Sequence, residues 1–299
     1  MKTLTIFTPT YNRAHTLVRT YNSLCQQTCK DFEWLIIDDG STDNTHEIVE
    51  KWISYSDFKI RYIYQENQGM HGAHNTAYKN ITTELNTCID SDDYMPVDAV
   101  ENIITFWHEN RSNKYAGIIG LDQRENGSII GTTFPQWMKE TTLQDFYAKG
   151  GKGDKKLVYR TDIIKQYPEY PLFEGERYVG LAYKYMLIDQ NYKLLTLNKP
   201  LVIVEYQADG SSNMMWKQYW YNPRGFAFFR KTEMVIAPTL TRRFISCIHY
   251  VSSCIISKNK KFLKESPQKM LTLFAIIPGV VFYNIIKHKV RQNKSLLVK

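Results

Sequence analysis

The sequence predicts an α/β fold in which a mostly parallel sheet is covered by helices on both faces. Two observations lead to this expectation. Short apolar runs alternate with segments of helical spacing through the first 125 residues, and strands alternating with helices indicate a parallel sheet. Three conspicuous polar segments each follow one of these apolar runs directly. At 299 residues the chain suits one large domain, or one domain with an appendage.

The expected elements follow one another in a regular order. Strands are expected at residues 4–8, 32–37, 59–64, 85–89 and 116–121. Helices are expected over residues 15–27, from the DDGSTDNT turn through Trp52, from about His71 onward, and over 97–110. The less regular middle predicts a mobile loop at 150–156, a helix at 176–190 and a strand at 199–206.

The three polar segments are Pro9–Arg13, Asp38–Thr45 and Asp90–Asp93. In open parallel sheets, ligands bind beyond the carboxyl ends of the strands. Because each segment follows a strand, we expect all three to converge on one rim of the sheet and to form a binding site there.

The third segment places Asp90, Asp92 and Asp93 within four positions, in the stretch CIDSDDYM. Three carboxylates this close repel one another unless a cation or water separates them. A D-x-D pair at a strand end suits Mg²⁺ or Mn²⁺, which take carboxylate, water and phosphate oxygens. The alternative is a solvated turn that caps the helix expected at 97.

The other segments contain groups that could bind a nucleotide. Asp39 at a strand end can accept hydrogen bonds from a nucleobase or ribose, although capping of the next helix is an alternative. The loop ENQGMHGAHN places glycines at a helix start, where backbone N–H groups suit phosphate. His71 and His74 could donate to phosphate oxygens. A zinc site is disfavoured, because no nearby Cys or third His completes it.

These segments together resemble the inverting glycosyltransferases of family two, which have the GT-A fold. The resemblance rests on TIFTPTYNRAHTL, WLIIDDGSTDNT, QENQGMHGAHN and DSDD, spans residues 3–125, and continues more loosely through FEGERYV (173–179) and VEYQADGSS (204–212). It implies a catalytic domain over residues 1–238, with a nucleotide-sugar-binding half (1–125) and an acceptor half (126–238).

The resemblance also implies the ligands and their contacts. Similar proteins use a nucleotide-diphosphate sugar, usually a UDP-sugar, and a divalent Mn²⁺ or Mg²⁺. Around the donor it implies Pro9, Thr10 and Tyr11 in the nucleotide pocket, Asp39 at the base, Asn67 and His74 at the nucleotide or phosphate, and Asp90 and Ser91 near the ribose and donor sugar. It implies that Asp92, with Asp93, binds the metal and that Asp92 thereby takes part in catalysis. The ion would offset the charge that grows on the diphosphate leaving group.

An inverting transfer also needs a base for the acceptor hydroxyl. In resembling sequences an acidic residue lies near the start of the helix after the middle section, where this chain reads FEGERYVGLAYKYM. We expect Glu176, or else Glu174, to be this base. Relatives with a similar stretch carry a further Glu where this chain has Leu181. Both glutamates could instead be helix-start carboxylates favoured by the helix dipole.

The formal net charge of +8 is unevenly distributed. Residues 239–299 carry 12 Lys and Arg and one acidic residue, around two uncharged stretches at 244–257 and 270–286. This pattern predicts helices that lie on an anionic membrane surface, with a core helix at 270–286 as the alternative. Nucleic acid is disfavoured, because the basic residues interleave with long apolar runs rather than lining a polar face.

The sequence therefore predicts a metal-dependent, inverting glycosyltransferase. It would transfer a sugar from a nucleotide-diphosphate donor to a lipid-linked saccharide acceptor in bacterial surface polysaccharide synthesis. The five cysteines have no C-x-x-C spacing and no export signal is visible, so we expect a cytoplasmic protein peripheral to the inner membrane face. One alternative is an inactive nucleotide-sugar-binding relative that partners another transferase. Another enzyme class, a nucleotidyltransferase or an aspartate phosphatase, is disfavoured; such phosphatases place D-x-D after the first strand.

Overall fold

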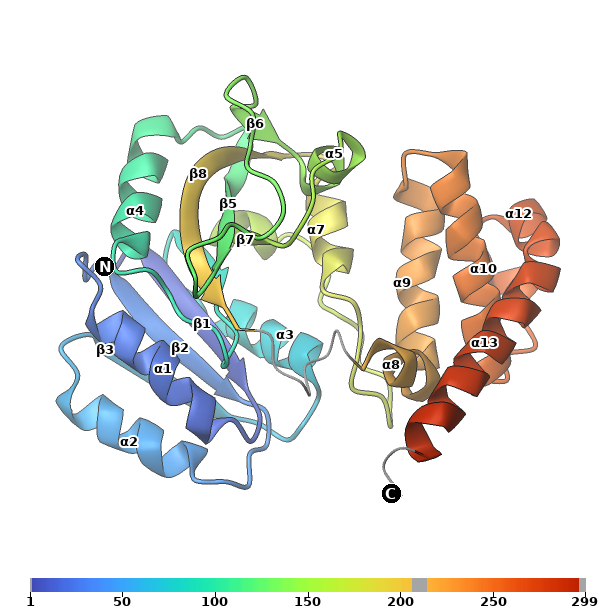
Figure 1. Ribbon diagram of the computed structural model, residues 1–299, viewed down its shortest axis with the longest axis horizontal. Coiled ribbons are helices and arrows are strands. Elements are labelled where there is room, and N and C mark those ends of the chain that lie inside the picture. The colour runs from blue at the N-terminus through green and yellow to red at the C-terminus, as the bar shows by residue number, and fades with distance from the viewer. Residues whose placement is uncertain (1, 206–213, 296–299) are drawn as a thin grey trace. The chain divides into compact units, whose positions relative to one another are not determined.

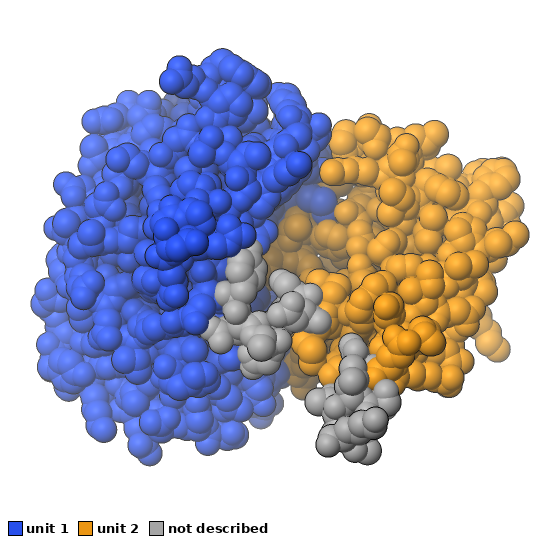
Figure 2. All heavy atoms as spheres, in the orientation of Figure 1, with its two compact units in different colours: residues 1–169, 184–207 blue, residues 170–183, 208–299 orange. Residues whose placement is uncertain are grey.

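The computed structural model describes residues 2–205 and 214–295. These form two compact units, shown in blue and orange in Figure 2: unit 1 is residues 1–169 and 184–207, and unit 2 is residues 170–183 and 208–299. The boundary expected between residues 238 and 239 falls inside unit 2, because helix α9 (Pro223–Ile236) packs against helix α10 (Leu240–Ile256). The basic C-terminal helices therefore share a core with residues that precede them.

Unit 1 contains a single mixed sheet among the described residues. Its strands are β1 (Leu4–Thr10), β2 (Phe32–Asp38), β3 (Lys59–Tyr64), β4 (Leu85–Cys88), β5 (Tyr115–Arg124), β6 (Glu140–Thr141), β7 (Lys155–Arg160) and β8 (Lys193–Val204). They lie in the order β3-β2-β1-β4-β7-β5-β8-β6. The pairs among β3, β2, β1 and β4 are parallel, β7 runs antiparallel to both β4 and β5, and β5 pairs in parallel with β8. The predicted α/β sheet is confirmed (Figure 1).

Helices cover both faces of this sheet, and β1 and β2 are therefore buried at every position. Apolar residues of α1 (Ala14–Cys25), α2 (Thr45–Tyr55) and α4 (Ala99–Asn110) share one core with β1 and β2. Within it, the Tyr21 ring stacks on Trp52 with centroids 4.3 Å apart. On the opposite face, α3 (Met70–Asn80) packs on β1 and β2, where Phe7 meets His74 edge to face.

The middle of the chain differs from the sequence-based expectation. It holds α5 (Leu143–Ala148), α6 (Thr161–Ile164) and α7 (Ala182–Ile188), and α7 is shorter than the helix expected at 176–190. The loop expected to be mobile runs into β7, and the Lys155 ammonium donates to the carbonyls of Ile130, Lys152 and Asp154 at 2.9–3.0 Å. A buried lysine thus holds this loop by bonds that its polar sequence does not predict.

Unit 2 is helical in its described part. Besides α9 and α10 it contains α8 (Met215–Tyr221), α11 (Phe262–Glu265), α12 (Lys269–Phe274) and α13 (Ile276–Ser295). A Cβ on Gly279 would lie 2.6 Å from the Val251 side chain, so glycine lets α13 approach α10 closely. The uncharged stretch 270–286 is divided between α12 and α13. Among the described residues, no helix is both long and apolar enough to cross a membrane.

Candidate active site

The candidate site lies in unit 1, at the carboxyl ends of β1, β2 and β4. Thr10 at the end of β1 pairs with Asp38 at the end of β2, and Phe7 pairs with Cys88 at the end of β4. The Asp39 amide donates to the Thr10 carbonyl at 2.8 Å. The structure therefore brings the three polar segments to one rim, as the order of strands and motifs predicts.

Asp39 connects the end of β2 to the loop before α3. Its carboxylate accepts hydrogen bonds from Gln65 Nε2 at 2.7 Å and from the amides of Gln68 and Gly69 at 2.9 and 2.8 Å. Gly40 has φ +90°, and a Cβ there would lie 3.0 Å from the amide nitrogen of half-buried Asn67. Asp39 and Gly40 therefore hold the Asn67 loop against the rim.

The end of β1, with Pro9 and Thr10, and the turn after it form the neighbouring part of the rim. Pro9 is buried, and the hydroxyl of buried Thr10 has no hydrogen-bond partner among the described residues. Tyr11 is 50% exposed. Asn12 has φ 53° and its side-chain oxygen accepts from the Thr42 amide at 2.7 Å, which ties this turn to the segment after β2. The turn thus presents an exposed aromatic ring and a buried hydroxyl beside Asp39.

His74 lies in the core rather than on the surface of the rim. Its ring is fully buried, packs edge to face on Phe7 at 4.9 Å, and shares a hydrogen bond of 3.1 Å with the Tyr78 hydroxyl. Burial and then the charge of Lys184 lower the pKa of His74 to about 3. The ring is therefore neutral and serves packing in this structure, and its expected phosphate contact stays a prediction.

The DSDD segment is anchored from three sides. Thr20 donates to the Asp93 carbonyl at 2.7 Å, and the Arg19 guanidinium donates to the Asp92 carbonyl at 3.2 Å. The Glu205 amide donates to the Asp93 carboxylate at 3.3 Å. Asp90 and Asp92 are half-buried, whereas Ser91 and Asp93 are buried. Helix α1 thus fixes the backbone that presents the carboxylates, and the residue after β8 holds the Asp93 side chain.

The acidic segment is partly compensated by a lysine from β7. Lys156 Nζ donates to the Cys88 carbonyl at 2.9 Å. Burial alone would lower the pKa of Lys156, but the charges of Asp122, Asp90 and Asp93 raise it. Burial, followed by the charge of Asp90, raises the pKa of Asp93 to about 8. A fixed ammonium therefore already stands near these aspartates.

Sequence reasoning missed Lys156 and Asp122. Asp122 on β5 is buried, and its Oδ1 has no hydrogen-bond partner among the described residues. Burial raises the pKa of Asp122 to about 6, against the charge of Lys156. Both residues come from strands that are distant in sequence from the DSDD motif. The sequence does carry a signal for these two residues, because Asp122 and Lys156 are charged residues within the strand segments LDQR and KKLVYR.

The carboxylates fit a metal that is shared with a ligand. Within residues 2–205 and 214–295, no three or more His, Cys, Asp or Glu side chains are grouped to hold an ion. Mg²⁺ and Mn²⁺ are usually bound by one or two carboxylates together with substrate phosphates and water. Asp92 and Asp93 offer such hard oxygen ligands, and the raised pKa of Asp93 reflects unfavourable burial that a cation would relieve.

The two expected base residues belong to unit 2 and differ in their surroundings. Glu176 is buried, with one carboxylate oxygen accepting from the amide and Nε of Arg224 at 3.0 and 2.9 Å. The other oxygen accepts from the Gly225 amide at 2.9 Å. Glu176 thus caps the first turn of α9. Glu174 is exposed, and Leu181 lies directly before α7.

A mixed, mostly parallel sheet flanked by helices, with acidic motifs at the carboxyl ends of β2 and β4, is the arrangement of the GT-A fold. The chain belongs to glycosyltransferase family 2, whose profile, "Glycosyl transferase family 2", matches residues 5–167. This confirms the resemblance that the four motifs indicate.

Individual bacterial relatives are named as glycosyltransferases. Glycosyltransferase GlyA of Streptococcus pneumoniae serotype 4 is 38% identical over 237 residues, which is 73% of this chain and 32% of that protein. The Escherichia coli protein WfgD is named as a UDP-Glc:alpha-D-GlcNAc-diphosphoundecaprenol beta-1,3-glucosyltransferase. It is 26% identical over 211 residues, 70% of this chain and 78% of that protein. The match to GlyA and that to a Rickettsia felis glycosyltransferase span only 32% and 23% of those proteins.

A solved structure shares the fold over nearly the whole chain. The crystal structure of Staphylococcus aureus TarS 1–349 in complex with UDP-GlcNAc has a TM-score of 0.61 at 19% identity, covering 98% of this chain and 92% of that one. At this identity the likeness supports the fold alone. The expected GT-A architecture is therefore confirmed independently of the sequence motifs.

Proposed function

We propose that this chain transfers a sugar from a UDP-sugar to a saccharide acceptor with inversion, forming a β-linkage in surface polysaccharide synthesis. The observation that carries the proposal is the rim that joins Asp39 and the Asn67 loop to the DSDD segment. Such a rim offers one carboxylate that can contact the nucleobase, and several carboxylates that can hold a metal ion bound to the diphosphate. The relative WfgD, named as acting on a diphosphoundecaprenol substrate, supports a lipid-linked acceptor.

In this mechanism the protein positions the donor. Tyr11, Asn67 and Asp39 would bind the nucleotide, and Asp90 with Ser91 would orient the ribose and sugar. Asp92 and Asp93 would hold Mn²⁺ or Mg²⁺, and a bound ion would supply Lewis-acid stabilisation of the leaving diphosphate. The Arg19 and Thr20 contacts with the Asp92 and Asp93 carbonyls keep this segment preorganised.

The base is proposed to be one of the two unit 2 glutamates. Both oxygens of Glu176 already accept hydrogen bonds at the start of α9, so proton abstraction would compete with capping. The Glu174 side chain is exposed. These contacts favour Glu174 as the base, with Glu176 as the alternative that the sequence motif suggests. In either case the carboxylate would take the acceptor hydroxyl proton as that oxygen attacks the anomeric carbon.

The second part of the proposal is attachment to an anionic membrane surface through residues 239–299. One side of the segment that contains α12 and α13 faces inward. Its buried residues are Ala275, Gly279, Ile286 and Val290. Apolar side chains also lie on its exposed side, at Met270, Phe274, Ile277, Val281 and Ile285, with 43–78% of each exposed. A helix that is apolar on both sides needs a second apolar environment.

Basic residues flank this apolar surface. Lys264 and Lys269 precede it, and Lys287, Lys289 and Arg291 follow it. Apolar insertion together with basic residues is the combination that binds helices to anionic lipid. We therefore propose that the protein acts at the inner face of the cell membrane, beside a lipid-linked acceptor.

A thermal-shift panel tests the donor assignment. A ligand that binds the folded state raises the melting temperature by mass action, so UDP-sugars with Mn²⁺ should stabilise the protein more than GDP-sugars with Mn²⁺. The Asp39→Asn variant should lose the stabilisation by UDP, and Asp57→Asn, an exposed carboxylate between α2 and β3, should keep it. If no nucleotide sugar changes the melting temperature, the proposed site is wrong.

A second candidate is an inactive relative that binds nucleotide sugar and assists another transferase. Leu181 at the position of a relative's glutamate, and the capping contacts of Glu176, favour it. Release of UDP from a stabilising UDP-sugar, measured with Mn²⁺ and without acceptor, separates the two. Slow donor hydrolysis supports the enzyme, whereas binding without any UDP release supports the inactive relative.

A further inference from the structure

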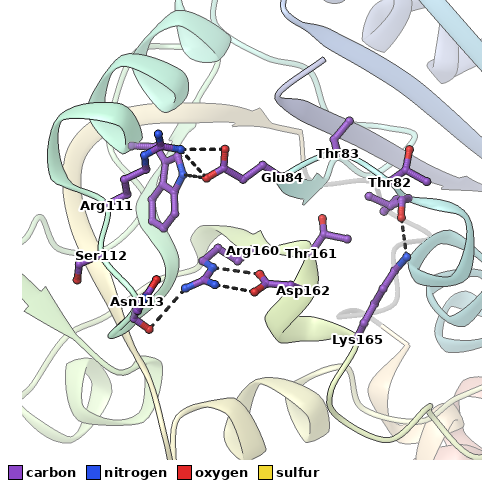
Figure 3. Close-up of a pocket in the computed structure, with 12 residues that line it drawn as sticks. Thr82, Thr83, Glu84, Arg111, Ser112, Asn113, Arg160, Thr161, Asp162 and Lys165 are labelled. Atoms are coloured by element: carbon purple, nitrogen blue, oxygen red, sulfur yellow. Dashed lines mark hydrogen bonds and ion pairs between the residues drawn. The ribbon is translucent and has the colours of Figure 1, made fainter. Parts of the chain in front are cut away.

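Unit 1 contains two neighbouring cavities at the end of the sheet opposite the candidate active site. The larger, of about 640 Å³, is lined by the segment before β4, the end of α4 and the end of β7 (Figure 3). The smaller, of about 270 Å³, is lined by α3, by α7 and by the segment that follows α6. Lys165 lines both cavities. We call the pair the amino-edge groove, since β1 and β4 begin beside it.

The groove is separate from the DSDD rim. Glu84 lies directly before β4, whereas Asp90 lies beyond its carboxyl end. Six residues of extended chain span about 20 Å. The Thr161 amide donates to the Glu84 carbonyl at 2.9 Å, which fixes the floor of the groove where β4 and β7 meet. A ligand in this groove would therefore leave the donor site accessible.

Its walls present charged groups already paired with one another. Arg111 Nη1 contacts both Glu84 oxygens at 3.0 and 3.1 Å, and Trp107 Nε1 donates to the same carboxylate at 2.8 Å. Arg160 forms a two-bond pair with Asp162 at 3.0 and 2.6 Å. Figure 3 shows these two pairs on facing sides of the cavity. The pairing holds the planar groups in fixed orientations.

Paired walls favour hydroxyl groups over phosphate. A hydroxyl both donates and accepts, whereas a phosphate mainly accepts. The groove offers carboxylate acceptors beside guanidinium donors, with hydroxyls of Thr82 and Ser112 also lining it. A phosphate in the same place would meet the carboxylates of Glu84 and Asp162. The arrangement therefore suits a polyhydroxylated ligand, and the combined volume lies in the range of ligand pockets.

The remaining charge is positive. The groove is lined by five basic and three acidic side chains. Lys165 donates to the Ile81 carbonyl at 2.6 Å, Lys79 pairs with Glu169 at 3.1 Å, and the buried Lys184 ammonium lies 4.8 Å from the Tyr78 ring centre. Five basic against three acidic side chains leave a formal excess of two positive charges in the groove. This excess favours a ligand with sparse negative charges.

We propose that the amino-edge groove binds a saccharide chain that carries carboxylate groups, at a site distinct from the donor site. The ion-paired walls recognise the sugar hydroxyls, and the lysines around Lys165 attract the carboxylates. Such a site would hold a growing acidic glycan on the enzyme while the donor site is recharged. This use goes beyond the proposed transfer, but binding in the groove does not depend on catalysis.

Titration calorimetry on the full chain tests this with named probes. A hyaluronan hexasaccharide, in which carboxylates alternate with neutral sugars, should bind more tightly than maltohexaose and than a thymidine hexanucleotide. Lys165→Glu and Lys79→Glu should each weaken hyaluronan binding by about tenfold, near 1.4 kcal/mol. Lys51→Glu, at an exposed position on α2, is the matched control and should leave the affinity unchanged.

Several results would overturn the inference: no hyaluronan binding by the wild type, tighter binding of the hexanucleotide or of maltohexaose, or equal affinities for the Lys165, Lys79 and Lys51 variants. The Lys79 side chain is exposed, so Lys79→Glu should keep the wild-type melting temperature. It therefore tests the groove even if Lys165→Glu does not fold. UDP binding is measured on the same samples. A wild type that binds hyaluronan but not UDP would refute the proposed function, and a wild type that binds UDP but not hyaluronan would refute only the groove.

Discussion

The contacts of Glu176 predict that this side chain stabilises unit 2. In Glu176→Ala the amides of Arg224 and Gly225 would lose their acceptor in the first turn of α9, where Glu176 is 7% exposed. Loss of a helix cap costs about 0.5–2 kcal/mol, and an unsatisfied buried donor costs about 1–3 kcal/mol. The ion pair adds little, about 0–1 kcal/mol, because the Arg224 side chain is 47% exposed.

We therefore expect Glu176→Ala to lower the free energy of unfolding by about 3 kcal/mol. Glu176→Gln keeps one acceptor oxygen and should lose roughly half as much. Urea unfolding followed by far-ultraviolet circular dichroism measures the change, because helices dominate unit 2. Glu174→Gln is the matched control: its side chain is exposed, so its free energy of unfolding should change by less than about 0.5 kcal/mol.

The same three variants separate stability from catalysis. If Glu174 is the base, Glu174→Gln loses turnover at an unchanged unfolding free energy. Glu176→Gln then keeps turnover at a temperature where it remains folded. The capping interpretation is refuted if Glu176→Ala is as stable as the wild type. The preference for Glu174 is refuted if its Gln variant retains full turnover in an acceptor-dependent assay.

Three further outcomes are expected. Asp92→Ala, or addition of a chelator, should remove the Mn²⁺-dependent part of UDP stabilisation in thermal-shift measurements, while Asp98→Ala should not. The pKa of Asp122 is raised from 3.8 to about 6, so the native state binds this proton more tightly than the unfolded state. The free energy of unfolding should therefore be highest below pH 4 and should fall by up to about 3 kcal/mol as the pH rises through 6. In urea titrations at pH 4.5 and 7.5, Asp122→Asn should flatten that dependence. Replacing Phe274 and Ile277 by Ser should reduce flotation with anionic vesicles by at least about a hundredfold, since each large apolar side chain contributes about 1.5–3 kcal/mol, whereas Ile53→Ser should leave it unchanged.

Local sequence predicts much of the parallel part of the sheet. The strands expected at residues 32–37 and 59–64 appear as β2 (Phe32–Asp38) and β3 (Lys59–Tyr64). The helix expected at 97–110 appears as α4. Each is a short apolar or periodic segment bounded by turn residues, so neighbouring residues are sufficient to define it. Strand direction alone places Asp39 and Asp90 at one rim.

The antiparallel part of the sheet was much less predictable. β7 inserts between β4 and β5, although these strands are consecutive in the list of expected strands. It begins within the stretch that its glycines and lysines suggest is a mobile loop. Pairing between distant strands depends on long-range packing, and no local pattern encodes it. Lys156 consequently lies beside Asp90 without any motif that announces it.

The sequence by itself determined the family, the order of the motifs and the rim on which they meet, because strand direction and turn chemistry are local properties. Only the tertiary structure decided which polar side chains are engaged elsewhere. His74 is buried against Phe7, and Glu176 caps α9. A side chain's neighbours come from segments far along the chain, and those neighbours determine whether its oxygen or nitrogen atoms remain available to a substrate.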